Sequence, residues 1–150
     1  MKTESFAKGR SKARFHAFVL IYQMSFYSND IESLAMAKAE YYAYLGKGNM
    51  PSKRYHEYID RVTWAVVEKC DAIDSILENY ADGWDVSRID KIDLAILRLA
   101  VHEIFAEEDV PPGVAVNEAV ELAKMFGSDK SPKFINGILG KIKRERLLSE

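Results

Sequence analysis

Apolar residues recur at intervals of three and four along most of the chain, which is the period of an amphipathic helix. Alternation of period two, the mark of a half-buried strand, is absent over any useful length. Proline, which breaks helices, occurs only at positions 51, 111, 112 and 132. The pattern therefore predicts an all-α fold, a compact bundle of about six or seven helices.

Turn-forming residues divide the first half of this pattern. The first helix is expected from about Ser11 to Tyr27, and its inner positions are expected to be Ala13, Ala17, Leu20, Ile21 and Met24. Residues 28–30 (Ser-Asn-Asp) should end it and cap a second helix that runs to about Leu45. The glycines at 46 and 48 then stop the chain. A third helical run extends from Lys53 to about Tyr80, and its length leaves room for a break or a bend. Gly83 marks the turn that follows.

The second half has a more apolar pattern. Residues 89–105 are apolar around most of the helical circumference, which predicts a central helix buried on several sides. A Pro-Pro break at 111–112 separates it from the next helix, and Gly127 is placed just past the end of that helix. The expected apolar stripe of that helix is Val116, Ala119, Val120, Ala123 and Phe126.

The last helix is expected to have Ser131 as its N-cap and Pro132 in its first turn. It contains Gly137 and Gly140, and each glycine costs about 1 kcal/mol relative to alanine inside a helix. Their presence predicts that another backbone approaches this helix closely.

Length and composition add the broad class. The 150 residues, of which 48% are hydrophobic, are enough for one globular domain over residues 1–150. The single cysteine, Cys70, cannot form an intramolecular disulfide, and no apolar run approaches the roughly 20 residues of a membrane span. No signal-peptide pattern follows Met1. A soluble, cytoplasmic protein without a membrane partner is the expectation.

The net charge of −2 conceals a segregation of charge. Residues 1–14 hold five basic side chains and one acidic one, and residues 130–150 hold six basic and two acidic. Two basic ends on an acidic body indicate a localised anion-binding surface. The alternative interpretation, that these ends are only solvated tails, stays open on charge alone.

Catalytic and metal sites have little support. His56 and Asp60 lie one turn apart with Glu57 between them, as in a truncated zincin motif, but the second histidine and a third ligand are missing. The glycines around Lys47 lack P-loop spacing, and Cys70 has no histidine nearby in the sequence. We therefore expect no enzyme, no metal and no cofactor.

Nucleic-acid binding has a better physical basis. Arg10, Lys12 and Arg14 alternate where a basic arm of about residues 1–12 meets the first helix, and Phe15, His16 and Phe18 follow. Arginine binds phosphate bidentately, helix N-termini donate free amides to it, and aromatic rings stack on unpaired bases. This arrangement suits single-stranded RNA, although core packing is the preferred interpretation for Phe18.

Three segments carry a family resemblance. They are residues 13–22, the block from Trp84 to Glu103 with its Ile-Leu-Arg-Leu-Ala core, and residues 110–142, where Val-Asn-Glu-Ala-Val-Glu-Leu-Ala-Lys precedes Phe-Ile-Asn-Gly-Ile-Leu. Together they resemble the NusB family of bacterial transcription antitermination factors. The resemblance implies a helical fold of two packed subbundles. It also implies binding to the boxA element of ribosomal RNA leaders jointly with NusE, a small-subunit ribosomal protein, within an elongation complex of RNA polymerase and other Nus factors.

The resemblance also implies site residues. Its RNA-binding set here comprises Arg10, Lys12, Arg14, Lys130, Lys133 and Phe134, and its partner-binding set comprises Asp93 and Arg98. Ser11 stands where many members have arginine, and Lys130 where an acidic residue is frequent. These departures change the expected RNA affinity in opposite directions.

Two alternatives accompany this prediction. The chain could be a protein-only interaction module, either a homodimer formed through an apolar groove or a NusB-like domain without RNA affinity. NusB-like domains also precede RNA cytosine methyltransferases. No Gly-rich cofactor-binding segment is present in the 150 residues, so we do not expect that activity.

Overall fold

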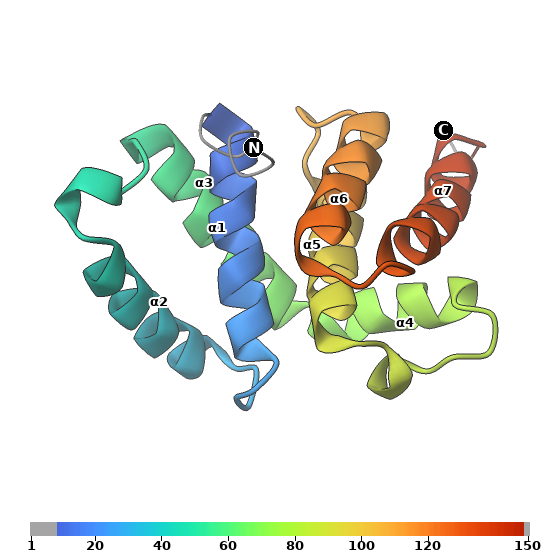
Figure 1. The fold of residues 1–150 in the computed structure, drawn as a ribbon, viewed down its shortest axis with the longest axis horizontal. Coiled ribbons are helices and arrows are strands. Elements are labelled where there is room, and N and C mark those ends of the chain that lie inside the picture. The colour runs from blue at the N-terminus through green and yellow to red at the C-terminus, as the bar shows by residue number, and fades with distance from the viewer. Residues whose placement is uncertain (1–8, 149–150) are drawn as a thin grey trace. The chain divides into compact units, whose positions relative to one another are not determined.

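Helices make up the regular structure of residues 9–148, which are the residues that the computed structural model describes (Figure 1). The all-α prediction is confirmed, and over this range the number of α-helices is seven. They are α1 (Gly9–Met24), α2 (Ile31–Leu45), α3 (Lys53–Glu68), α4 (Cys70–Tyr80), α5 (Lys91–Ala106), α6 (Pro112–Phe126) and α7 (Ser131–Leu148), with short 3-10 turns η2 (Lys47–Asn49) and η3 (Val86–Arg88).

The chain divides into two compact units, Met1–Lys69 and Cys70–Glu150. The first unit contains α1, α2 and α3, and the second contains α4 to α7. Each unit is a continuous stretch of sequence, in agreement with the two subbundles that the family resemblance implies.

The core of the first unit is built on α1. The expected inner positions of this helix are each at most 3% exposed, namely Ala13, Ala17, Leu20, Ile21 and Met24. The helix packs on both α2 and α3. Small residues on α1 allow a close helix approach, and the larger ones supply the apolar area that stabilises the unit.

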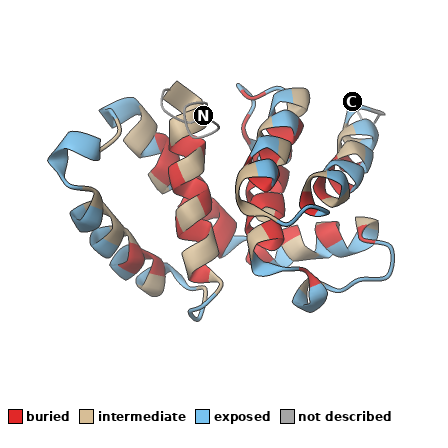
Figure 2. Cartoon of the chain, in the orientation of Figure 1, coloured by how far each residue is buried: buried red, intermediate tan, exposed pale blue. Residues whose placement is uncertain are grey.

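Helix α2 has the ends that the sequence predicts. The Asp30 carboxylate accepts a hydrogen bond from the Ser33 amide at 2.7 Å, which caps the helix. At the other end Gly46 adopts φ 74° and ψ 168°, a region that is essentially open only to glycine. Between these ends only Leu34 and Ala37 are buried, so apolar packing holds this helix weakly (Figure 2).

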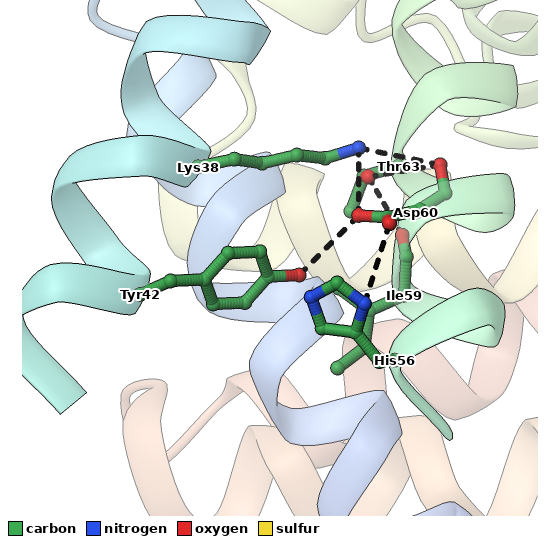
Figure 3. A network of polar contacts seen from close by, with 6 residues as sticks. All are labelled: Lys38, Tyr42, His56, Ile59, Asp60 and Thr63. Carbon is green, nitrogen blue, oxygen red and sulfur yellow. Dashed lines mark hydrogen bonds and ion pairs between the residues drawn. The ribbon is translucent and has the colours of Figure 1, made fainter. Parts of the chain in front are cut away.

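Polar contacts supply the remaining attachment of α2 to α3 (Figure 3). The Asp60 carboxylate lies 3.1 Å from Lys38 Nζ, accepts a hydrogen bond from the Tyr42 hydroxyl at 3.4 Å, and lies 3.5 Å from His56 Nδ1. Burial, followed by the charge of Asp60 and its hydrogen bond, raises the pKa of Tyr42 well above its usual value. Tyr42 therefore stays protonated as the donor. The His56–Asp60 pair considered above as metal ligands belongs to this network.

The long helical run breaks once, at Lys69, between α3 and α4. Neither proline nor glycine stands there. The buried positions Val66, Cys70, Ile73 and Leu77 continue across the break at spacings of four, three and four. Because the apolar stripe is uninterrupted, the helical pattern is compatible with a break but does not indicate where it occurs.

Helix α5 is the centre of the second unit. Eleven of its sixteen residues are buried, which confirms the prediction of a central helix (Figure 2). The Asp90 carboxylate caps its start by accepting hydrogen bonds from the amides of Ile92 at 2.9 Å and Asp93 at 3.4 Å. A cap directly before a buried helix fixes where the side chains of its first turn lie.

The structure corrects several details of α6 and α7. Buried positions on α6 include Ala115 and Leu122 beside Val116, Ala119 and Ala123, whereas Val120 and Phe126 are only partly buried. Ser131 is already part of α7 and is therefore not its N-cap, since the Lys130 carbonyl accepts the first helical hydrogen bond from the Phe134 amide.

The glycines of this region also differ from expectation. A Cβ at Gly127 would lie 2.5 Å from Ser131 Cβ and 2.9 Å from the Ala123 carbonyl, so close approach, rather than a left-handed backbone, requires glycine there. Apart from the chain neighbours and the backbone of the same helix, no described atom lies within 4 Å of a Cβ built on Gly137, and only the Arg144 side chain lies near Gly140. The prediction that another backbone packs against these two positions is therefore wrong within residues 9–148.

No helix in the described range is both long enough and apolar enough to cross a membrane.

Candidate nucleic-acid interface

The predicted RNA-binding residues fall in two places, one in each unit. In the first unit Arg10 and Lys12 occupy the first turn of α1 and are partly exposed. The Arg10 guanidinium lies 4.6 Å from the centroid of the Tyr58 ring, which belongs to α3. This cation–π contact fixes the direction of the Arg10 side chain against a ring that is only 2% exposed. Most of the basic arm, residues 1–8, lies outside the described residues.

Arg14 does not share this surface. Its side chain is only 2% exposed, and His16, two residues further on, is 4% exposed. Burial and then the charge of Lys12 lower the pKa of His16, so its imidazole is neutral at physiological pH. RNA contact by Arg14 remains an untested prediction, and its burial argues against that prediction. Phe18 is 4% exposed, as core packing requires.

The second unit contains a cleft of about 940 Å³. It lies among the end of α4, the segment that leads into α5, the turn before α7 and the first half of α7. The structure brings together here the predicted RNA-binding residues Lys130, Lys133 and Phe134 and the predicted partner-binding residue Asp93. Gly137 lies on the same wall, where its missing side chain keeps the space open.

Further residues of the cleft carry the same chemistry. Trp84 is 50% exposed and Arg88 is exposed, and both line the cleft. Lys141 lines it too and lies 3.4 Å from Asp82 Oδ2, in an exposed ion pair that constrains it little. Sequence reasoning missed these three as site residues. Two features of the sequence pointed to these residues, namely the excess of basic residues after position 130 and the block that begins at Trp84. Neither feature showed that the two segments lie together in the fold.

Asp93 is the buried acid of this cleft. It is 7% exposed, and its Oδ1 atom has no hydrogen-bond partner within residues 9–148. Burial raises the pKa of Asp93; the Ser131 hydroxyl opposes this by hydrogen bonding, and the charge of Asp90 adds to it. A buried acceptor without a donor is costly, so a ligand that brings an N–H or O–H group would be stabilised here.

Arg98, the second predicted partner-binding residue, forms an ion pair within the second unit. Its Nε donates to Asp74 Oδ1 at 2.9 Å, and its Nη2 donates to Asp74 Oδ2 at 2.8 Å. The two side chains are 12% and 14% exposed, and neither residue lines the cleft. This bidentate pair joins α5 to α4 and gives Arg98 a structural role.

Comparison with known proteins assigns the family. The family model for the NusB family matches residues 11–144. The chain belongs to the NusB family. It is 40% identical over 141 residues to the transcription antitermination protein NusB of Acetivibrio thermocellus, covering 94% of this chain and 92% of that protein. The NusB of Agathobacter rectalis is 37% identical over 134 residues, 88% of this chain and 97% of the relative.

Solved structures agree with the NusB assignment. The structure of T. maritima NusB superposes with a TM-score of 0.81 at 30% identity, covering 92% of both chains. A chain of the structure titled "Crystal Structure of Antitermination Factors NusB and NusE in complex with dsRNA" superposes with a TM-score of 0.73 at 26% identity, covering 89% of this chain and 94% of the other. The protein is thus a NusB-family antitermination factor rather than an enzyme. The described residues hold no group of three metal-ligating side chains.

Proposed function

We propose that this NusB-family factor binds the boxA element of ribosomal RNA leader transcripts together with NusE. In this way it promotes processive transcription of ribosomal RNA by RNA polymerase with the other Nus factors in the cytoplasm. The observation that carries the proposal is the meeting of Lys130, Lys133 and Phe134 at one cleft. A relative of the same fold was solved with NusE and RNA, which supports the choice of both partners.

The chemistry of the cleft suits unpaired RNA. Lys130 and Lys133 are exposed cations at the start of α7 and are suited to bind phosphate. Phe134 and Trp84 provide ring faces on which bases can stack, at about 1–3 kcal/mol per base. In a duplex the base faces are already stacked, so such a surface favours a single strand. Arg10 and Lys12 of α1 provide a second phosphate-binding element in the other unit.

We propose that Asp93 forms part of the NusE-binding site. A donor group of the partner would satisfy its Oδ1 atom, which has no partner among the described residues. Such a contact would offset the cost of burying the carboxylate. Arg98 then contributes by holding α5 against α4 through Asp74, not by touching the partner.

Fluorescence anisotropy with a labelled boxA RNA and a scrambled RNA, each with and without NusE, tests this function. We expect boxA to bind more tightly than the scrambled RNA and to bind more tightly still with NusE. Lys133→Gln should weaken RNA binding, whereas Lys124→Gln, which removes an exposed cation outside the cleft, should not. Equal and weak binding of both RNAs, unchanged by NusE, would contradict the proposal and favour a protein-only module or a homodimer.

A further inference from the structure

Helix α3 presents two chemically different faces. His56, Asp60 and Thr63 share one face, which carries the network that joins α3 to α2 (Figure 3). Arg54 and Arg61 lie seven residues apart, two helical turns, and so share the opposite face with Tyr58 between them. The acidic side chain of Asp60 is therefore directed toward Lys38 and away from the two arginines.

On the face of α3 opposite Asp60, guanidinium groups contact aromatic rings. Arg61 lies 5.8 Å from the centroid of the Tyr58 ring, the ring that Arg10 of α1 contacts at 4.6 Å. Arg54 lies 5.4 Å from the centroid of the Tyr55 ring. Contacts of this kind fix the direction of a flexible side chain. Three arginines from two helices are thus held on neighbouring rings.

The charge on this face is positive. The exposed charged residues of α3 are Lys53, Arg54, Glu57, Arg61 and Glu68, three cations against two acids. Arg10 adds a further cation from α1. Clustered cations attract phosphate, and arginine suits phosphate better than lysine, since its planar fork binds two phosphate oxygens at once.

We propose that Arg54, Tyr55 and Arg61, which we call the α3 face, bind the sugar-phosphate backbone of single-stranded RNA and extend the contact made by Arg10 and Lys12. The inference rests on the proposed RNA-binding function. It assigns RNA contacts to a stretch of the chain, residues 53–61, where the sequence motifs place none. Partly exposed Tyr55 offers a ring edge to the RNA while it orients Arg54.

The salt dependence of RNA binding tests the α3 face. Each phosphate contact to a single strand contributes about 0.7 to the slope of log K against log salt. We expect Arg54→Gln to lower that slope by about 0.7 and Arg54→Gln with Arg61→Gln to lower it by about 1.4, for boxA and scrambled RNA alike. Lys69→Gln is the matched control, because Lys69 is an exposed cation past the end of the same helix. Thermal melting of each variant verifies the fold.

The outcomes separate this inference from the function on which it rests. Wild-type protein that does not bind RNA would contradict the proposed function. Wild-type binding together with an unchanged slope in folded Arg54→Gln and in the double variant would overturn the α3 face alone. If Arg61→Gln lowers the melting temperature, the salt slope of Arg54→Gln alone tests the α3 face. Arg54→Lys keeps the charge, so it should retain the slope while binding more weakly than the wild type.

Discussion

The ion pair between Arg98 and Asp74 gives the most direct test of how the second unit is held together. Asp74→Ala removes the acceptor of two charge-assisted hydrogen bonds of 2.9 and 2.8 Å and leaves the guanidinium in a site where it was only 12% exposed. Exposed pairs contribute about 0–1 kcal/mol, whereas removing one partner of a buried pair costs about 3–5 kcal/mol. Because this pair is largely but not fully buried, we expect a loss of about 2–4 kcal/mol in the free energy of unfolding.

Urea unfolding measures that loss, and a double variant identifies its cause. Arg98→Met with Asp74→Leu removes both charges and should recover most of the stability, since the cost lies mainly in the unpaired charge. Glu121→Ala serves as the control, because Glu121 pairs with Lys124 in a bridge whose side chains are 50% and 48% exposed. That change should cost less than about 0.5 kcal/mol.

The reasoning would be refuted if Asp74→Ala matched Glu121→Ala in stability. The pair would then be screened by solvent despite its burial, and Arg98 would be available for a partner. The folded double variant provides the complementary readout: it should still bind NusE, since we place Arg98 away from the partner. Loss of NusE binding without loss of stability would restore Arg98 to the partner-binding set.

Three further changes test the cleft and its supports. Phe134→Ala should weaken RNA binding by about 1–3 kcal/mol in anisotropy titrations through lost stacking, and an unchanged Kd would remove Phe134 from the site. Burial raises the pKa of Asp93 above its ordinary value of 3.8. At a pH above that ordinary value, ionisation of the buried carboxylate therefore lowers the free energy of unfolding, whereas the protonated form has no such cost. Asp93→Asn should therefore increase the free energy of unfolding at pH 7, with the gain disappearing as the pH falls below about 4; a gain independent of pH would exclude this cause. Gly127→Ala places a methyl group 2.5 Å from Ser131 Cβ and should cost about 1–3 kcal/mol by overpacking, which calorimetry would detect as a lower Tm, while an unchanged Tm would mean that the turn adjusts freely.

Local sequence signals predicted most helix ends, because the groups that end a helix are near it in sequence. Asp30 and Asp90 cap helices through amides two or three residues ahead, and Gly46 and Gly83 adopt positive φ. The α1 core stripe followed from helical period alone. The break at Lys69 did not, because the buried stripe passes through it without a change of period.

The candidate site was less accessible to sequence reasoning. Arg14 belongs to the same basic run as Arg10 and Lys12, and nothing in that run distinguishes the one that is 2% exposed. The partner of Arg98 lies 24 residues away, on another helix. Trp84 and Lys141 line one cleft although they lie 57 positions apart in the sequence. Such pairings depend on tertiary packing, which local patterns do not encode.

The division of the chain into two continuous units also orders its synthesis. All of α1 to α3 precedes Cys70, so the first unit can fold while the rest is still being translated. The cleft of the second unit cannot form until α7 has left the ribosome, because α7 supplies Lys133 and Phe134. At about 5–20 residues per second, the interval from Lys69 to Phe134 is roughly 3–13 s. During that interval the nascent chain carries Arg10 and Lys12 of the first unit without the cleft of the second, so both of the RNA-binding surfaces that we propose are present only once α7 is complete.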